Sequence, residues 1–399
     1  MSVRANPDLA NIGALISDPL TYQRDEWEPL FALLRQEDPV HHVQDSAFGE
    51  YWAITRFGDI REIETNYRIF SSDWRSGGVD PTVGTPMHSL LMMDPPEHTK
   101  HRDVVKRLGL PQTVASFEEL VRKTTRQVLA ALPRGEVFDF VDRVSIEITA
   151  TLLAAMLGYP MEQRRELVHW SDTITSFASD PESQAETLRF AESMGSWLER
   201  RAAQPPSNDL LSILAHSDLM STVSAEHRLE TVMTFLVGGN DTTRNTMSGG
   251  LWALWEHPGE LEKLRANPKH LSSFVQESLR WQTASMCMRR NALEDFDFHG
   301  HKIKKGDKVV LWWLSGNRDE QAIDRANEFI VDRERPWRHL AFGHGIHRCL
   351  GAKLAELQLG ILWEEFFSQR LNFEVIAKPE YAPSAILRTI RHLPVRITN

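Results

Sequence analysis

The residues best suited to chemistry lie at positions 342–351, where the sequence is Phe-Gly-His-Gly-Ile-His-Arg-Cys-Leu-Gly. This stretch contains Cys349, one of only two cysteines in the 399-residue chain, the other being Cys287. Its three glycines permit backbone turns that other residues rarely adopt: Gly343, Gly345 and Gly351. Leu350–Phe367 then has helical apolar spacing, so Cys349 is expected at a helix N-terminus, where amide groups and the helix dipole stabilise a thiolate. One thiolate on a glycine-lined loop suits an axial bond to haem iron.

Two other interpretations of Cys349 compete with this one. A lone cysteine is more often a small buried hydrophobic residue than a ligand. A zinc site is the second alternative, because four side chains in this region offer nitrogen or sulfur ligands: His339, His344, His347 and Cys349. Neither alternative explains why an aromatic residue, glycines, a histidine and the cysteine occur in this order.

A second candidate site lies in the middle of a long predicted helix, Ala225–Trp255, which would extend about 45 Å. Gly238 and Gly239 are adjacent in its interior, where each costs roughly 1 kcal/mol relative to alanine. Either the close approach of a bulky planar group or tight packing against another helix would explain this destabilising pair.

An acid and an alcohol follow these glycines as Asp241 and Thr242. A threonine hydroxyl can donate to a carbonyl one turn earlier and so open the helix locally. Such an opening could hold a water molecule and relay protons to bound oxygen.

The remaining composition excludes several classes of protein. A net charge of −10 argues against a nucleic-acid-binding protein, whose affinity requires a basic face. Residues 1–25 mix charges with short apolar runs and do not resemble a signal peptide, and no window of about 20 apolar residues could span a membrane. Two cysteines provide no disulfide framework, which predicts a reducing cytoplasm.

The elements expected to position these residues are mostly helices. Short apolar and β-branched runs predict strands at Tyr51–Thr55 and within Phe296–Leu314, where Ile303–Asp307 is expected to form a hairpin turn. Gly77–Pro86 is expected to be a loop. Besides the long helix, helical periodicity covers Leu30–Glu37, Phe57–Asn66, Ser116–Leu132, Val144–Leu157, Gln163–Phe177, Gln184–Arg201 and Asp209–Ala215. We therefore expect one mainly α domain, residues 1–399, with a small β portion.

The stretch 342–351 resembles the haem-binding loop of the cytochrome P-450 family, and Gly-Gly-Asn-Asp-Thr-Thr at 238–243 resembles that family's oxygen-activation motif. The resemblance covers essentially the whole chain. It implies a cytochrome P-450-type domain with a long central helix over haem b, with Cys349 as the axial iron ligand. It further implies that Thr242 faces dioxygen and that Asp241 relays protons.

Other family motifs supply further expected roles. Glu277 and Arg280 match the family's Glu-x-x-Arg brace, whose third, basic member is expected at Arg333 or Arg335. Without the resemblance, a solvated surface ion pair would be the simpler interpretation of Glu277 and Arg280. Partners for the haem propionates are implied at His98, Arg102, His347 and either Arg290 or Arg289, of which the sequence that follows favours Arg290.

Within the family, several segments resemble the bacterial soluble terminal alkane and fatty-acid hydroxylases. Departures from that subgroup are Ala284 in place of proline, His344 in place of phenylalanine, and the Ala352-Lys353 pair. The resemblance implies a monooxygenase that inserts one atom of O2 into a C–H bond near the terminus of a medium-chain alkane, alcohol or fatty acid. A terpene or alkyl-aromatic is the alternative substrate, because Ala284 could widen the pocket. Expected substrate-facing residues are Leu91, Val237, Gly238, Ser285 and Met286.

A haem-thiolate protein that binds a ligand without oxidising it is the competing class, and the Asp241–Thr242 pair argues against it. No reductase is expected within this fold, so NAD(P)H electrons would arrive through a separate ferredoxin and ferredoxin reductase. A basic docking face is expected from Arg107, Arg338, Arg348 and Lys353. The protein is expected to be a cytoplasmic monomer.

Overall fold

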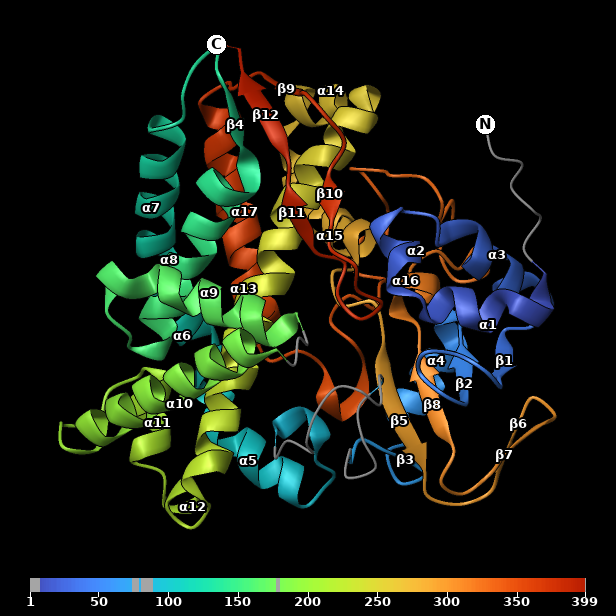
Figure 1. Cartoon of the computed structure of the whole chain (residues 1–399). Coiled ribbons are helices and arrows are strands. Elements are labelled where there is room, and N and C mark those ends of the chain that lie inside the picture. Colours follow the sequence, from blue (N-terminus) through green and yellow to red (C-terminus); the bar gives the residue numbers. More distant parts are fainter. Residues whose placement is uncertain (1–7, 74–78, 80–88, 177–179, 399) are drawn as a thin grey trace.

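The computed structural model describes residues 8–73, 79, 89–176 and 180–398. A large helical part lies beside a smaller part rich in strands, as the left and right sides of Figure 1 show. The loop predicted at Gly77–Pro86 lies outside the described residues except for Val79.

The helical part contains most of the chain. The α-helices are α1 (Leu9–Ser17), α2 (Pro19–Gln23), α3 (Glu28–Glu37), α4 (Phe57–Thr65), α5 (Glu97–Val105), α6 (Pro111–Ser116), α7 (Glu118–Ala130), α8 (Glu147–Leu157), α9 (Arg164–Thr175), α10 (Pro181–Ala202), α11 (Leu210–Ala215), α12 (Asp218–Ser221), α13 (Ala225–Glu256), α14 (Pro258–Ala266), α15 (Leu271–Gln282), α16 (Trp313–Gly316) and α17 (Ala352–Ser368). Short helical turns are η1 (Leu90–Met92), η2 (Lys106–Gly109), η3 (Val141–Ile146), η4 (Met161–Gln163), η5 (Pro268–His270) and η6 (Gly345–His347).

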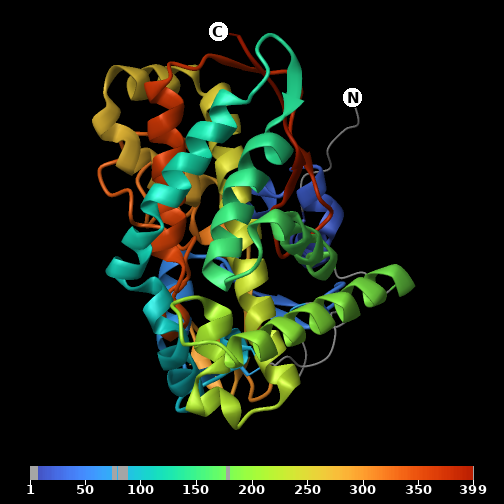
Figure 2. The ribbon, with the colours of Figure 1, turned by 90° about the vertical axis from the view of Figure 1, so that its left-hand side faces the viewer.

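The long predicted helix is α13, which runs through the middle of the helical part (Figures 1 and 2). Ser224 caps its N-terminus, because the serine Oγ accepts a hydrogen bond from the His227 amide at 3.1 Å. The helix packs against α8, α9, α15 and α17. Apolar side chains of these helices form the main hydrophobic core.

The strands in the described part of the chain form four small sheets. The largest has the order β1-β2-β8-β5-β3, in which β2 and β8 are parallel and the other pairs are antiparallel. In the other sheets β12 pairs with both β4 and β9, β10 pairs with β11, and β6 pairs with β7. The strands are β1 (Val40–Val43), β2 (Tyr51–Ile54), β3 (Phe70–Ser71), β4 (Val137–Asp139), β5 (Met288–Ala292), β6 (Phe296–Phe298), β7 (His301–Ile303), β8 (Lys308–Leu311), β9 (Phe373–Val375), β10 (Glu380–Tyr381), β11 (Ile390–His392) and β12 (Pro394–Ile397).

The mainly α fold with a small β portion is as predicted, but one turn was assigned wrongly. The segment predicted as a hairpin turn joins β7 to β8, and these strands do not pair with each other. Strand β7 pairs with β6, whereas β8 enters the large sheet because Val309, Val310 and Leu311 are completely buried there. The apolar run then leaves the sheet and forms α16.

Candidate active site

The cysteine loop is folded against the last turn of α4. The Cys349 amide donates to the Phe342 carbonyl at 2.9 Å, which closes the loop. Gly343 and Gly345 have φ angles of +64° and +68°, which side-chain-bearing residues rarely adopt. A Cβ at Gly345 would also lie 2.3 Å from the Glu64 carbonyl oxygen, so contact with α4 independently requires a glycine there.

The Cys349 thiol opens into an internal cavity next to the start of α17. Helix α17 begins at Ala352 with Gly351 as its N-cap, slightly later than predicted. Burial raises the pKa of the Cys349 thiol, although the Gly351 and Ala352 amides and the Arg348 guanidinium lower it. The predicted stabilising amides are therefore present but do not by themselves favour the thiolate. Coordination to a metal ion deprotonates such a thiol.

The two glycines of α13 have different surroundings across the cavity. A Cβ at Gly238 would meet no atom within 4 Å, whereas one at Gly239 would lie 3.3 Å from Leu153 Cδ1 of α8. Gly238 thus leaves space on the cavity side, and Gly239 permits close helix packing. Thr242 also lines the cavity, and its hydroxyl donates to the Gly238 carbonyl at 3.0 Å. This is the predicted bond to a carbonyl one turn earlier, and α13 runs through this turn without a break.

Asp241 faces away from the cavity, one residue before Thr242. Its side chain is 1% exposed and its Oδ1 lies 2.9 Å from Arg244 Nη2. The Ser171 hydroxyl and the Asn240 amide donate to its two oxygens, each at 3.0 Å. Burial raises the pKa of Asp241 to about 6, and Asp172 adds to that effect while Arg244 opposes it. Asp241 is therefore held by other residues and is not among the described residues that line the cavity.

One end of the cavity carries the basic residues that the sequence assigned to carboxylates. Arg102, Arg290 and His347 line it, and the rings of His347 and His98 are 4.3 Å apart. Burial lowers the pKa of His98 to about 4 and that of His347 to about 2, so both imidazoles are neutral at neutral pH. His98 Nε2 is buried without a hydrogen-bond partner among the described residues. This end therefore offers two guanidinium groups and an unused imidazole nitrogen to an anionic ligand.

Arg289 does not belong to this group. Successive residues of a strand face opposite sides, and Arg290 is the one that lines the cavity. Arg289 instead donates to the Asn291 side-chain oxygen through Nε at 2.9 Å and Nη2 at 2.6 Å. Arg289 is not among the described residues that line the cavity.

Glu64, which the sequence analysis missed, also lines the cavity close to Arg290. The sequence signal that could have revealed Glu64 was its position after Ile60 and Ile63 on α4. These three residues share a helix face on which the two isoleucines are fully buried.

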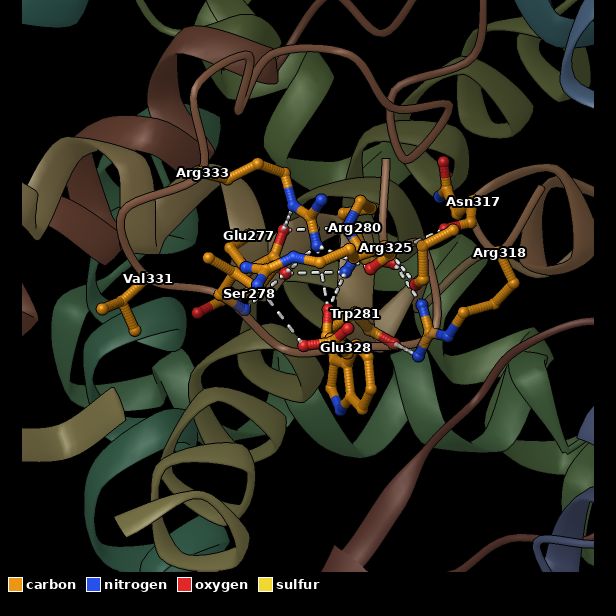
Figure 3. A network of polar contacts seen from close by, with 12 residues as sticks. Glu277, Ser278, Arg280, Trp281, Asn317, Arg318, Arg325, Glu328, Val331 and Arg333 are labelled. Atoms are coloured by element: carbon orange, nitrogen blue, oxygen red, sulfur yellow. Dashed lines mark hydrogen bonds and ion pairs between the residues drawn. The ribbon is translucent and has the colours of Figure 1, made fainter. Parts of the chain in front are cut away.

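The predicted brace is buried rather than on the surface, and Figure 3 shows its polar contacts. Glu277 accepts hydrogen bonds from Arg280 at 2.8 and 2.6 Å and from Arg333 at 2.9 and 3.1 Å. Arg333 therefore takes the third position, and Arg335 is exposed. Arg280 also donates to the carbonyls of Asn317 and Ala326 at 2.7 Å, which ties α15 to the segment before the loop.

His339, one of the histidines of the zinc alternative, has other partners. The ring nitrogens of His339 lie 2.9 Å from Gln276 Oε1 and 3.2 Å from the Ala341 amide nitrogen. Burial lowers the pKa of His339 to about 4. In the described part of the chain, no three His, Cys, Asp or Glu side chains converge as metal ligands do. The geometry therefore does not support the zinc interpretation.

Three of the five predicted substrate-facing residues line the cavity: Leu91, Gly238 and Ser285. Val237 is not in the lining because it lies on another side of α13. Met286 is completely buried in a separate core with Cys287 and Trp312. Lining residues that the sequence did not reveal come from α8 and the preceding turn of α13, and include Leu152, Leu153, Met156, Thr234 and Phe235.

The arrangement fits a haem. One thiol, a glycine surface opposite it, and basic groups with an unpartnered imidazole nitrogen are the donor set for a flat, dicarboxylated iron cofactor. The family model for Cytochrome P450 matches residues 189–393. The chain belongs to the cytochrome P450 family. Haem-thiolate chemistry and monooxygenase activity with dioxygen follow from that membership.

Relatives span nearly the full length of this P450. Linalool 8-monooxygenase of Pseudomonas putida is 32% identical, with 98% of each chain covered. Steroid C26-monooxygenase of Mycobacterium tuberculosis is 30% identical over 96% of this chain and 92% of its own. The solved structure of cytochrome P450-153 from Novosphingobium aromaticivorans has a TM-score of 0.89 and 36% identity, covering 96% of this chain and 98% of that one. Among the described residues, no helix has the length and apolar character needed to cross a membrane.

Proposed function

We propose that this P450 hydroxylates a neutral, medium-length linear alkane or alcohol at or near its terminus. The observation that carries the proposal is the absence of charge in the described cavity lining contributed by η1, α8 and α13. That lining consists of apolar residues, glycines and hydroxyl groups, the last including Thr234 and Thr242. Burial of apolar surface, at about 25 cal/mol per Å², then supplies most of the affinity.

The distribution of charge favours an alkane or alcohol over a fatty acid. The charged residues in the described lining are Glu64, Arg102 and Arg290, which lie at the end assigned to the haem carboxylates. A buried substrate carboxylate without a basic partner would be strongly disfavoured. A hydroxyl group, by contrast, could bond to the pair formed by Ser89 and Thr234, whose oxygens are 2.8 Å apart.

A terpene is the second candidate substrate, and the similarity to linalool 8-monooxygenase favours it. The resemblance of several segments to the terminal alkane hydroxylases favours the linear chain. The test is incubation of the reconstituted enzyme with octane, 1-octanol, octanoic acid and linalool, followed by mass spectrometry of the products. Terminal oxidation of octane or 1-octanol is expected. Product from linalool alone would discard the linear-chain proposal.

Thr242 and Asp241 are proposed to deliver protons to the cavity. Bound haem supplies dioxygen activation and oxidation of the C–H bond. The Thr242 hydroxyl faces the cavity and can donate there when it releases the Gly238 carbonyl. Asp241 is not among the described residues that line the cavity, so its protons must pass through water or through the Thr242 turn. Arg244 links it to Asp172, whose side chain is half exposed and can exchange protons with solvent.

Electrons are proposed to come from NAD(P)H through a ferredoxin and its reductase. Arg107, Arg338, Arg348 and Lys353 are all exposed, and Arg348 and Lys353 flank Cys349 in the chain. Lys353 is the least available of the four because it pairs with Glu356 at 2.7 Å. Association with an acidic ferredoxin should weaken as salt screens these charges. Electron-transfer rates that do not change with ionic strength would contradict this docking face.

A further inference from the structure

Glu64 is a buried carboxyl group to which the function described so far gives no role. It lies in the last turn of α4, its side chain is 1% exposed, and it lines the same cavity as Cys349. Ile60 and Ile63 on the same helix face are completely buried. A carboxyl group in such a setting is costly unless a partner satisfies it.

The described residues provide no adequate partner. Arg290 Nη2 lies 3.7 Å from Glu64 Oε1, which is too long for a hydrogen bond, and Arg290 Nη1 already donates to the Arg289 carbonyl at 2.7 Å. Trp313 and the His344 amide approach the carboxyl group, but neither makes a well-formed hydrogen bond to it. Both carboxyl oxygens are therefore available to a ligand in the cavity.

The charges around Glu64 determine what kind of contact a haem carboxylate could make. Arg102 and Arg290 are the guanidinium groups that line the cavity, while Arg61 lies on the exposed side of α4. His98 and His347 are neutral, as described above. The carboxylate of Asp94 accepts hydrogen bonds from the Ser71 hydroxyl and the Ser72 amide. His344, from the cysteine loop, accepts a hydrogen bond from Arg61 at 3.4 Å.

Two guanidinium groups balance the two carboxylates of a haem. An ionised Glu64 would add a third negative charge in a buried site without a third cation. One proton retained among the three carboxyl groups removes that imbalance and creates a donor for a short hydrogen bond.

We propose that Glu64 retains a proton and donates it in a hydrogen bond to a haem carboxylate, which couples the reduction potential of the haem to pH. Burial raises the pKa of Glu64 to about 7, with Arg290 opposing, and two nearby haem carboxylates act in the same direction as burial. Loss of the proton at higher pH adds negative charge near the iron. Because reduction also adds negative charge, the potential should fall as pH rises. The inference rests on the haem site and is independent of the proposed substrate.

The test is a spectroelectrochemical titration of the haem-loaded protein between about pH 6 and 9, a range that brackets the pKa of Glu64. The wild-type midpoint potential should fall with increasing pH. Glu64→Gln, which mimics the protonated acid, should show a nearly flat profile at the wild-type acidic value. Glu62→Gln is the matched control, because Glu62 is an exposed carboxylate on the same helix, and its profile should match wild type.

A flat wild-type profile, or a Glu64→Gln variant that keeps the wild-type slope, would overturn the proposal. If Glu64→Gln does not retain haem, Glu64→Asp is used instead. The shorter acid must shift the pH midpoint of the potential titration, and an unchanged midpoint would also overturn the proposal. Infrared difference spectra of the wild-type holoprotein need no variant. They must contain the C=O band of a protonated carboxylic acid that changes on reduction. The red-shifted band of the carbon monoxide complex reports thiolate ligation separately. Failure of the haem site can therefore be distinguished from failure of the Glu64 proposal.

Discussion

Arg244 Nη2 lies 2.9 Å from Asp241 Oδ1 on α13 and also pairs with Asp172 of α9. Arg244 is 4% and Asp241 1% exposed, whereas Asp172 reaches the surface. The three residues therefore connect solvent to the turn that carries Thr242. Their charges act on Asp241 in opposite directions, since Arg244 lowers its pKa and Asp172 raises it.

The first prediction concerns the pH dependence of turnover. Asp241 has a pKa of about 6, so the acidic limb of the coupled turnover profile should reflect its ionisation. Arg244→Gln removes a stabilising positive charge and should move this limb to higher pH. Asp172→Asn removes a negative charge and should move it lower. Asp241→Asn should slow turnover at every pH. Shifts of the same sign in Arg244→Gln and Asp172→Asn would contradict the relay.

The second prediction tests the hydroxyl of Thr242. Thr242→Ala should consume reducing equivalents at a rate near wild type but release more peroxide and less hydroxylated product, because proton delivery in the cavity is impaired. Thr246→Val is the control, since Thr246 also lines the cavity and donates to the carbonyl one turn earlier, at 2.8 Å. The measurement is the ratio of product to NAD(P)H consumed. Equal coupling in both variants would remove Thr242 from the mechanism.

The third prediction identifies the iron ligand. Cys349→Ser should abolish the red-shifted Soret band of the reduced carbon monoxide complex, because the thiolate produces that shift. Cys287→Ser should retain the band, since Cys287 is 1% exposed in a separate core and its sulfur lies 3.6 Å from the Ala385 carbonyl. A Cys349→Ser protein with an unchanged band would refute the assignment.

The fourth prediction concerns the buried brace. Arg333→Met leaves Glu277 with one cation instead of two and should lower the free energy of unfolding by about 3–5 kcal/mol. Arg335→Met, at an exposed position, should change it by less than about 0.5 kcal/mol. Urea denaturation of the holoproteins with a haem-absorbance readout gives both values. Similar losses in the two variants would show that Arg335 shares the role.

The brace should also make stability depend on acidity. Burial raises the pKa of Glu277, but Arg280 and Arg333 outweigh burial and lower it below the usual range. A carboxyl group whose folded-state pKa is lowered contributes stability above its unfolded pKa, and this is lost as pH falls through the folded value. The difference in stability between wild type and Arg333→Met should therefore shrink below about pH 4.

Local sequence determined the parts of the site that depend on neighbours in the chain. The cysteine loop, the glycine pair of α13 and the Glu277–Arg280 pair were all recognisable, because turns and helical spacing act over a few residues. The mainly α fold was predictable for the same reason, since long segments such as α13 have strong helical periodicity. The pairing of β6, β7 and β8 was not predictable from the sequence, because it depends on which strand is buried.

Tertiary structure decided between candidates that the sequence left open. Arg290 rather than Arg289 faces the cavity because the sheet sets which side of β5 is inward. Arg333 rather than Arg335 reaches Glu277 because the segment after α15 folds back over it. Glu64 became a candidate only when α4 and the cysteine loop were brought together. In each case the deciding quantity is burial against a distant segment, which changes charge and hydrogen bonding without altering the local sequence pattern.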